Sequence, residues 1–178
     1  SKNGNGYFLM VEGGRIDHAL HGTNAKRVME DTIAFDEAIK AALAKVDLGN
    51  TLVVFTADHD HTLAINGYSK RGNPILDISR NYKDGKEAKD ADGNTFTTLV
   101  FGNGPNRKDT RTSIVSGNTD SSMALHDDYL QETAVRLASE THGGGDVMLG
   151  ASGAGARSFK GSMDNTKVFT LLKSAFGF

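Results

Sequence analysis

The sequence predicts an α/β protein with a mostly parallel central sheet, and three observations support this fold class. Two apolar runs, at residues 7–11 and 51–56, are typical of strands that are buried on both faces. Between them, apolar side chains recur every third or fourth residue over 24–46, which predicts an amphipathic helix. A strand, a helix and a second strand in this order form a βαβ unit, which favours a parallel pair with a right-handed crossover.

The rest of the chain predicts a less regular arrangement around this unit. The chain has 178 residues, which suits one domain or a large part of one. Residues 67–119 are rich in Gly, Asn, Asp, Lys and Arg, and we interpret them as an excursion of hairpins and loops with one strand inside it, at 96–101. Beyond the excursion we predict a helix, a short strand and a last helix, at 122–138, 146–150 and 165–176.

Composition excludes several kinds of site. The chain has no cysteine, which rules out a disulfide framework, a cysteine zinc finger, an iron–sulfur cluster and a thiol nucleophile. Any zinc site must therefore use His, Asp and Glu. The net charge is −2 and the charges are mixed along the chain, so we expect no nucleic-acid-binding surface. We expect no membrane segment and find no signal-like apolar region.

Histidine and carboxylate side chains follow each strand of the predicted βαβ unit. Asp17 and His21 are four residues apart, which puts both on one face of a helix. Glu12 ends the first strand, and Asp58 and His59 directly follow the second. Each pair alone is also typical of a solvated surface. Because sites in α/β sheets gather at the carboxyl ends of strands, the coincidence predicts a metal site.

Three motifs resemble the metal-binding segments of bacterial-type alkaline phosphatases. They are Val-Glu-Gly-Gly-Arg-Ile-Asp-His-Ala-Leu-His at 11–21, Thr-Ala-Asp-His-Asp-His at 56–61 and Glu-Thr-His-Gly-Gly at 140–144. Residues 67–74 and 96–105 also resemble the family between those motifs. The resemblance implies a three-layer α/β/α fold, of which residues 1–178 would be the C-terminal part of a single catalytic domain, with the excursion at about 67–119.

The resemblance also implies two zinc ions and one magnesium ion in each active site. The residues that match ligand positions are Asp17, His21 and His142 for the first zinc, Asp58 and His59 for the second, and Glu12 for magnesium. His61 would orient a ligand from outside the coordination sphere. His18 would either contact phosphate through water or simply face solvent.

The function implied is hydrolysis of phosphate monoesters through a phosphoserine intermediate. The family's nucleophilic Ser follows an Asp, and no Asp-Ser-Ala match occurs in these residues. We therefore expect the nucleophile and the phosphate-clamping Arg in a missing N-terminal part of the same protein, and the isolated chain to be inactive. The alternatives are another hydrolase of the same superfamily (a phosphodiesterase, phosphomutase or sulfatase) or an inactive metal-binding fragment. The resemblance further implies a homodimer in the periplasm or secreted from the cell.

Two features near the motifs match no role in this scheme. Asp60 lies between motif residues but at no ligand position. The glycines at 143–145 suggest a phosphate-binding loop, but the Lys and Ser or Thr that should follow are absent. His126 is interpreted as a surface residue of the predicted helix at 122–138.

Overall fold

The computed structural model describes residues 3–177, which divide into two compact units. One unit holds the chain up to Phe35 together with Leu63–Thr141. The other holds Asp36–Thr62 together with the chain from His142 onward. Among these residues no helix is both long and apolar enough to cross a membrane.

The helices follow the sequence pattern closely. They are α1 (Arg15–His21), α2 (Ala25–Leu43), the 3₁₀ turn η1 (Ala156–Ser158) and α3 (Thr166–Ala175). The predictions of helices at 24–46 and 165–176 are confirmed by α2 and α3. Both carry an apolar stripe at a spacing of three and four. Such periodicity is a local property of the sequence, so it predicts a helix without knowledge of distant segments.

Polar side chains secure the start of α2. The Oδ1 atom of Asn24 accepts a hydrogen bond from the Arg27 N–H at 3.0 Å, as an N-cap does. The Ala25 N–H donates to Oε1 of Gln131 at 2.8 Å, although the two residues are far apart in the sequence. Lys26 pairs with Asp127. The contacts of Asn24 and Gln131 satisfy amide groups that the first helical turn leaves without partners.

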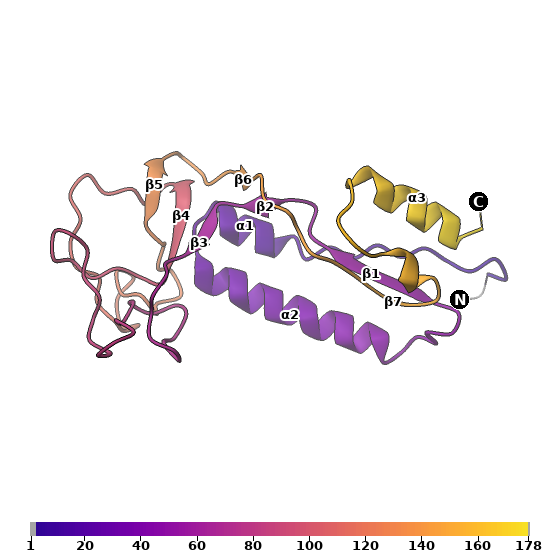
Figure 1. Ribbon diagram of the computed structural model, residues 1–178, viewed down its shortest axis with the longest axis horizontal. Helices are drawn as coiled ribbons and strands as arrows, with labels where there is room; N and C mark the ends of the chain where they lie inside the picture. Colours follow the sequence, from indigo (N-terminus) through magenta and orange to yellow (C-terminus); the bar gives the residue numbers. More distant parts are fainter. Residues whose placement is uncertain (1–2, 178) are drawn as a thin grey trace. The chain divides into compact units, whose positions relative to one another are not determined.

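The strand at 51–56 forms, but its partner differs from the prediction. It is β1 (Leu52–Thr56), and it pairs antiparallel with β7 (Leu149–Gly153), so that the two lie side by side (Figure 1). The predicted parallel βαβ pair is therefore wrong for β1 within residues 3–177, and the strand expected at 146–150 lies a few residues later. The ring of Phe55 covers Gly150, where a Cβ would collide with it, so the small residues of β7 suit this partner.

The apolar run at 7–11 is not a strand in the structure. Its side chains are exposed, from 55% for Tyr7 to 77% for Met10, which contradicts the buried strand that we expected. A strand requires a neighbour that takes up its backbone hydrogen bonds. The ladders formed within residues 3–177 do not include this segment, so its apolar composition alone produced the wrong prediction.

The helix expected at 122–138 is also wrong. Turns are followed there by β5 (Thr133–Arg136), which pairs parallel with β4 (Leu99–Gly104), while β3 (Leu63–Ile65) pairs antiparallel with β4 on the other side. This three-stranded sheet contains the one parallel pair among the described strands. The Thr133 hydroxyl donates to the Gly104 carbonyl at 3.2 Å, and β4 buries Leu99 and Phe101. The stabilisation from pairing with this buried strand is greater than the weak helical preference of the sequence at 122–138.

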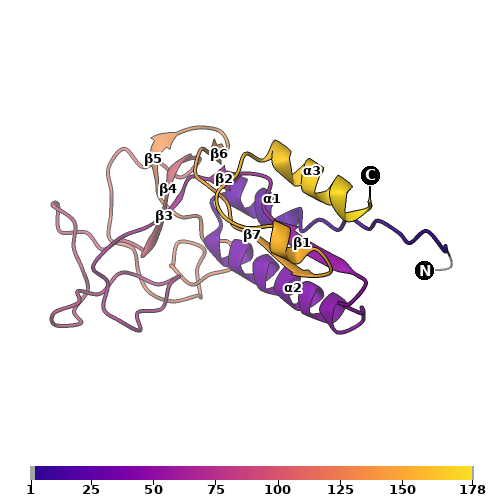
Figure 2. The same cartoon turned by 45° about the vertical axis from the view of Figure 1, so that its right-hand side comes forward.

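Between these strands the chain runs mostly through turns and loops, visible in both ribbon views (Figure 1, Figure 2). Isolated bridges join Ser69 to Asn81 and Ile78 to Thr97. A small apolar cluster lies under the loops, formed by Ile78, Ile114, Ala124 and Tyr129. Burial raises the pKa of the Tyr129 phenol above its ordinary value, as expected for an ionisable group held among apolar neighbours.

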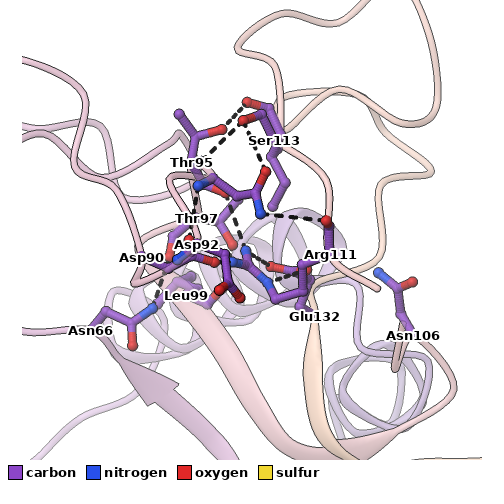
Figure 3. Close-up of polar contacts among 12 residues, drawn as sticks. Asn66, Asp90, Asp92, Thr95, Thr97, Leu99, Asn106, Arg111, Ser113 and Glu132 are labelled. Carbon is purple, nitrogen blue, oxygen red and sulfur yellow. Dashed lines mark hydrogen bonds and ion pairs between the residues drawn. The ribbon is translucent and has the colours of Figure 1, made fainter. Parts of the chain in front are cut away.

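Arg111 joins two of these loops to the segment before β5. Figure 3 shows its guanidinium between Asp90 and Glu132. Its Nε and Nη2 atoms donate to the two carboxylate oxygens of Glu132 at 2.9 and 2.5 Å, and Nη2 also donates to the Thr95 carbonyl at 3.2 Å. The Glu132 carboxylate, with Asp90, holds the pKa of Arg111 above its ordinary value. A bidentate pair of this kind is both strong and directional.

We predict that Arg111→Ala destabilises this unit in the intact protein. The side chain is only 23% exposed, and its loss leaves the Glu132 carboxylate, which is 13% exposed, without its cation. The expected loss in the free energy of unfolding is about 1.5–3 kcal/mol, measured by urea unfolding. Arg107 is exposed, so Arg107→Ala is the control and should have little effect. Equal stability of the two variants would contradict the structural role of Arg111.

Asp90 makes the same network sensitive to acid. Its pKa is lowered from the ordinary value of 3.8, first by the hydrogen bond from the Asn94 N–H and then by those from the Asp92 N–H and Arg111. Because the folded-state pKa is the lower one, ionised Asp90 stabilises the fold above 3.8, and this stabilisation is lost as the pH falls through the folded-state pKa.

We therefore expect Asp90→Asn to lower the melting temperature at about pH 7, and to lower it progressively less as the pH falls below 3.8 towards the folded-state pKa. Thermal melts of the variant and the parent protein across this range provide the measurement. A difference that does not shrink with falling pH would show that the charge of Asp90 contributes nothing.

Candidate metal centre

Asp17 and His21 form the first group of candidate ligands. Both project from α1, and Oδ1 of Asp17 lies 3.3 Å from Nε2 of His21. The prediction that a spacing of four places them on one helical face is confirmed. Zinc sites in proteins use carboxylate oxygens and imidazole nitrogens as ligands, and this pair places one of each close together.

The sequence did not reveal that His21 has a partner in Glu140. Nδ1 of His21 lies 2.6 Å from the Glu140 carbonyl oxygen and 3.7 Å from Oε2 of its carboxylate. The Glu140 N–H in turn donates to the His21 carbonyl at 3.0 Å. Glu140 is only 2% exposed, and nothing in the local sequence signals its contact with a residue so distant along the chain.

The contact with the Glu140 carbonyl determines the proton position on His21. A carbonyl oxygen can only accept a hydrogen bond, so Nδ1 must carry the proton that it shares with Glu140. In the neutral ring the lone pair is then on Nε2, the atom that faces Asp17. A backbone carbonyl on one ring nitrogen is the usual means of orienting a histidine that binds metal through the other.

The second group is formed in the other unit by three histidines. β2 (Asp60–His61) pairs antiparallel with β6 (His142–Gly143), which places His61 opposite His142. The rings of His59 and His142 stack with centroids 3.5 Å apart, and the His61 ring lies 5.0 Å from the first and 5.2 Å from the second. One ring nitrogen from each of the three lies within 4.8 Å of the others. Three imidazole nitrogens at this separation could hold one metal ion.

Asp58 extends this second group into solvent. Its Oδ2 atom lies 3.4 Å from Nε2 of His59, and its side chain is 89% exposed. Nδ1 of His59 lies 3.2 Å from the Asp60 carbonyl, which orients that ring in the way that Glu140 orients His21. Asp58 and His59 are thus placed as a pair at the turn after β1, as their adjacency in the sequence suggested.

Two of the remaining candidates, Glu12 and His18, occupy exposed positions, and His126 is half-buried. Glu12 lies on the exposed chain before α1, and His18 is exposed on α1. His126 is not on a helix; its Nδ1 accepts a hydrogen bond from the Asp128 N–H at 3.0 Å within a turn. Its interpretation as a helix residue is wrong because the segment turns towards β5.

The comparison with known protein families agrees with these two groups. The alkaline phosphatase family model matches residues 1–178, which is the whole chain. The chain belongs to the alkaline phosphatase family. Its members contain metal ions, and the histidine and carboxylate groups described above suit that chemistry. The family gives this chain an α/β fold class, whereas among the described strands only β4 and β5 pair in parallel.

Individual alkaline phosphatases give the same result. The chain is 38% identical over 156 residues to a tissue-nonspecific isozyme from Felis catus and 39% identical over 155 residues to an alkaline phosphatase from Gadus morhua. It is 38% identical over 170 residues to a membrane-bound alkaline phosphatase from Bombyx mori. These matches cover 86%, 85% and 94% of the chain but 28%, 30% and 29% of the relatives. All three relatives are animal proteins, so the narrower likeness to the bacterial type stays a prediction.

We predict that His21 carries its proton on Nδ1 in the metal-free protein at a pH where the ring is neutral. The reason is that the Glu140 carbonyl can only accept a hydrogen bond. Nitrogen-15 chemical shifts of the histidine rings distinguish the two tautomers, and His21→Asn identifies the resonance. A proton found on Nε2 instead would contradict the contact with Glu140.

Proposed function

We propose that this chain supplies metal-binding residues to an enzyme that hydrolyses phosphate monoesters. The observation that carries the proposal is the group formed by His59, His61 and His142, in a chain whose full length matches the alkaline phosphatase family. Imidazole nitrogens and carboxylate oxygens are the donors that zinc accepts in a site without cysteine. Asp17 with His21 provides a second such concentration.

The donor types support zinc at both groups. Asp17 and His21 would hold the first zinc, and Asp58 and His59 the second, since each pair has its donor atoms within 3.4 Å. The allocation of His142 to the first zinc stays a prediction. Glu12, which offers only oxygen donors, would hold magnesium. When bound, such ions supply Lewis-acid chemistry that polarises phosphoryl oxygens.

The other residues would orient ligands or substrate. His61 is 8% exposed and lies beside both of the other histidines, which suits a role in positioning them. The Glu140 carbonyl keeps the Nε2 lone pair of His21 directed towards Asp17. His18 is exposed and would contact phosphate through water.

The remainder of the reaction depends on residues outside this chain. Because the chain spans less than a third of the length of its relatives, we propose that the nucleophilic Ser and the phosphate-clamping Arg come from another part of the protein. We further propose a phosphoserine intermediate, a homodimer, and a location in the periplasm or outside the cell. A phosphodiesterase or a sulfatase would hydrolyse a different ester, and a phosphomutase would move the phosphoryl group within its substrate instead of transferring it to water.

We predict that His59→Ala lowers both the zinc content and the activity of the intact protein. Loss of a ligand should reduce zinc affinity by about 100-fold or more and hydrolysis of p-nitrophenyl phosphate with it. Elemental analysis and initial rates provide the two measurements. His126→Ala is the matched control, since that histidine lies in a turn outside both groups.

Zinc content that is unchanged in His59→Ala would contradict the assignment of this residue to a metal. If the parent protein hydrolyses phosphate diesters or sulfate esters faster than phosphate monoesters, the substrate class that we propose is wrong.

A further inference from the structure

We infer that Asp60 is a positioning residue for His142, because its carboxylate holds the glycine turn that follows this histidine. Gly145 donates its N–H to Oδ2 of Asp60 at 3.1 Å. Asp60 also lies opposite Gly143 in the β2–β6 ladder. The turn at 143–145 is thus attached to β2 twice, through the backbone at one end and through the Asp60 side chain at the other.

The glycines fit this close approach. A Cβ at Gly143 would lie 2.6 Å from Oδ2 of Asp60 and 2.6 Å from the His61 carbonyl oxygen. A Cβ at Gly145 would lie 2.5 Å from Oδ2 of Asp60, and one at Gly144 would meet nothing within 4 Å. Packing against the β2 backbone therefore requires Gly143, and a Cβ at Gly145 would displace the Asp60 carboxylate from the turn. This accounts for the glycine run without a phosphate-binding loop.

The consequence for the histidines follows from the length of the ladder. β2 and β6 pair over only two residues each, too few to hold His142 rigidly by themselves. The Asp60–Gly145 hydrogen bond closes the turn directly after His142 and so limits the motion of its backbone. The His142 ring then stays stacked on His59 at 3.5 Å, with its donor nitrogen near those of the other two histidines. Holding ligands in place beforehand reduces the ordering cost of binding.

A double-mutant cycle on protein stability tests the contact between Asp60 and Gly145, and it needs no metal. We expect Gly145→Ala to lower the melting temperature of the intact protein by roughly 4 °C, because its Cβ collides with Asp60. In an Asp60→Ala background most of that loss should disappear. Gly144→Ala is the matched control and should have a small effect, because the space there is open.

Gly143→Ala provides the opposite comparison. The added Cβ meets the His61 carbonyl oxygen as well as Asp60. The decrease in melting temperature caused by Gly143→Ala should therefore persist in the Asp60→Ala background. If Gly145→Ala costs the same with and without Asp60, the inference that Asp60 holds the turn is overturned.

Zinc binding tests the positioning role, and this part rests on the proposed function. We expect Asp60→Ala to weaken zinc binding by about 10–100-fold in competition with a chelator. Asp60→Asn should recover most of the affinity, because its amide oxygen can still accept from the Gly145 N–H. Asp164→Ala is the control in the same unit. Oδ1 of Asp164 accepts from the Thr166 N–H at 3.0 Å, so its loss affects stability but not zinc.

Zinc affinity in Asp60→Ala equal to that of the parent protein would overturn the positioning role. A failure of the proposed function is distinguishable from this result. In that case His59→Ala would leave zinc content unchanged. The comparison of Gly145→Ala with and without Asp60→Ala would still decide whether Asp60 holds the turn.

Discussion

The pairing of β2 with β6 is the constraint on which the candidate metal centre most depends. Two residues from each strand form the ladder, and it places His61 opposite His142 although the two are distant in the sequence. The approach is so close that a Cβ at Gly143 would lie 2.6 Å from the His61 carbonyl oxygen. Such tight packing has a purpose at a metal site, since donor atoms must be held within a few tenths of an ångström of their positions before the ion binds.

In the other unit, different contacts bring candidate donor atoms together. Asp17 and His21 come together through the helical repeat, and a distant carbonyl, that of Glu140, then orients the imidazole. In this group a local motif supplies both donors and a remote carbonyl orients one of them. In the histidine group the remote strand β6 supplies a donor itself, His142. The orientation matters for any metal site built on these residues, because a histidine binds a metal ion only through a ring nitrogen that carries no proton.

Polar contacts rather than a large core stabilise the loops between the strands. The buried apolar cluster contains only four side chains, whereas Arg111 alone reaches two carboxylates and a carbonyl (Figure 3). Charge-assisted hydrogen bonds order irregular backbone well, because they satisfy groups that cannot join a ladder. Such a network depends on the ionisation of its acids, and apolar packing does not.

Local patterns in the sequence determined the parts of the protein that need only near neighbours. These are the helices α2 and α3, the Asp17–His21 pair on α1 and the adjacent candidate ligands Asp58 and His59. Helical hydrogen bonds join residues four apart, so periodicity predicts them directly. The tertiary structure alone decided the antiparallel partner of β1, the strand β5 in place of a helix, and the contacts of Glu140 with His21 and of Asp60 with Gly145. Strand partners and ligand-orienting groups come from distant segments. The local sequence carries no signal of which distant segment will pack against a given strand or side chain.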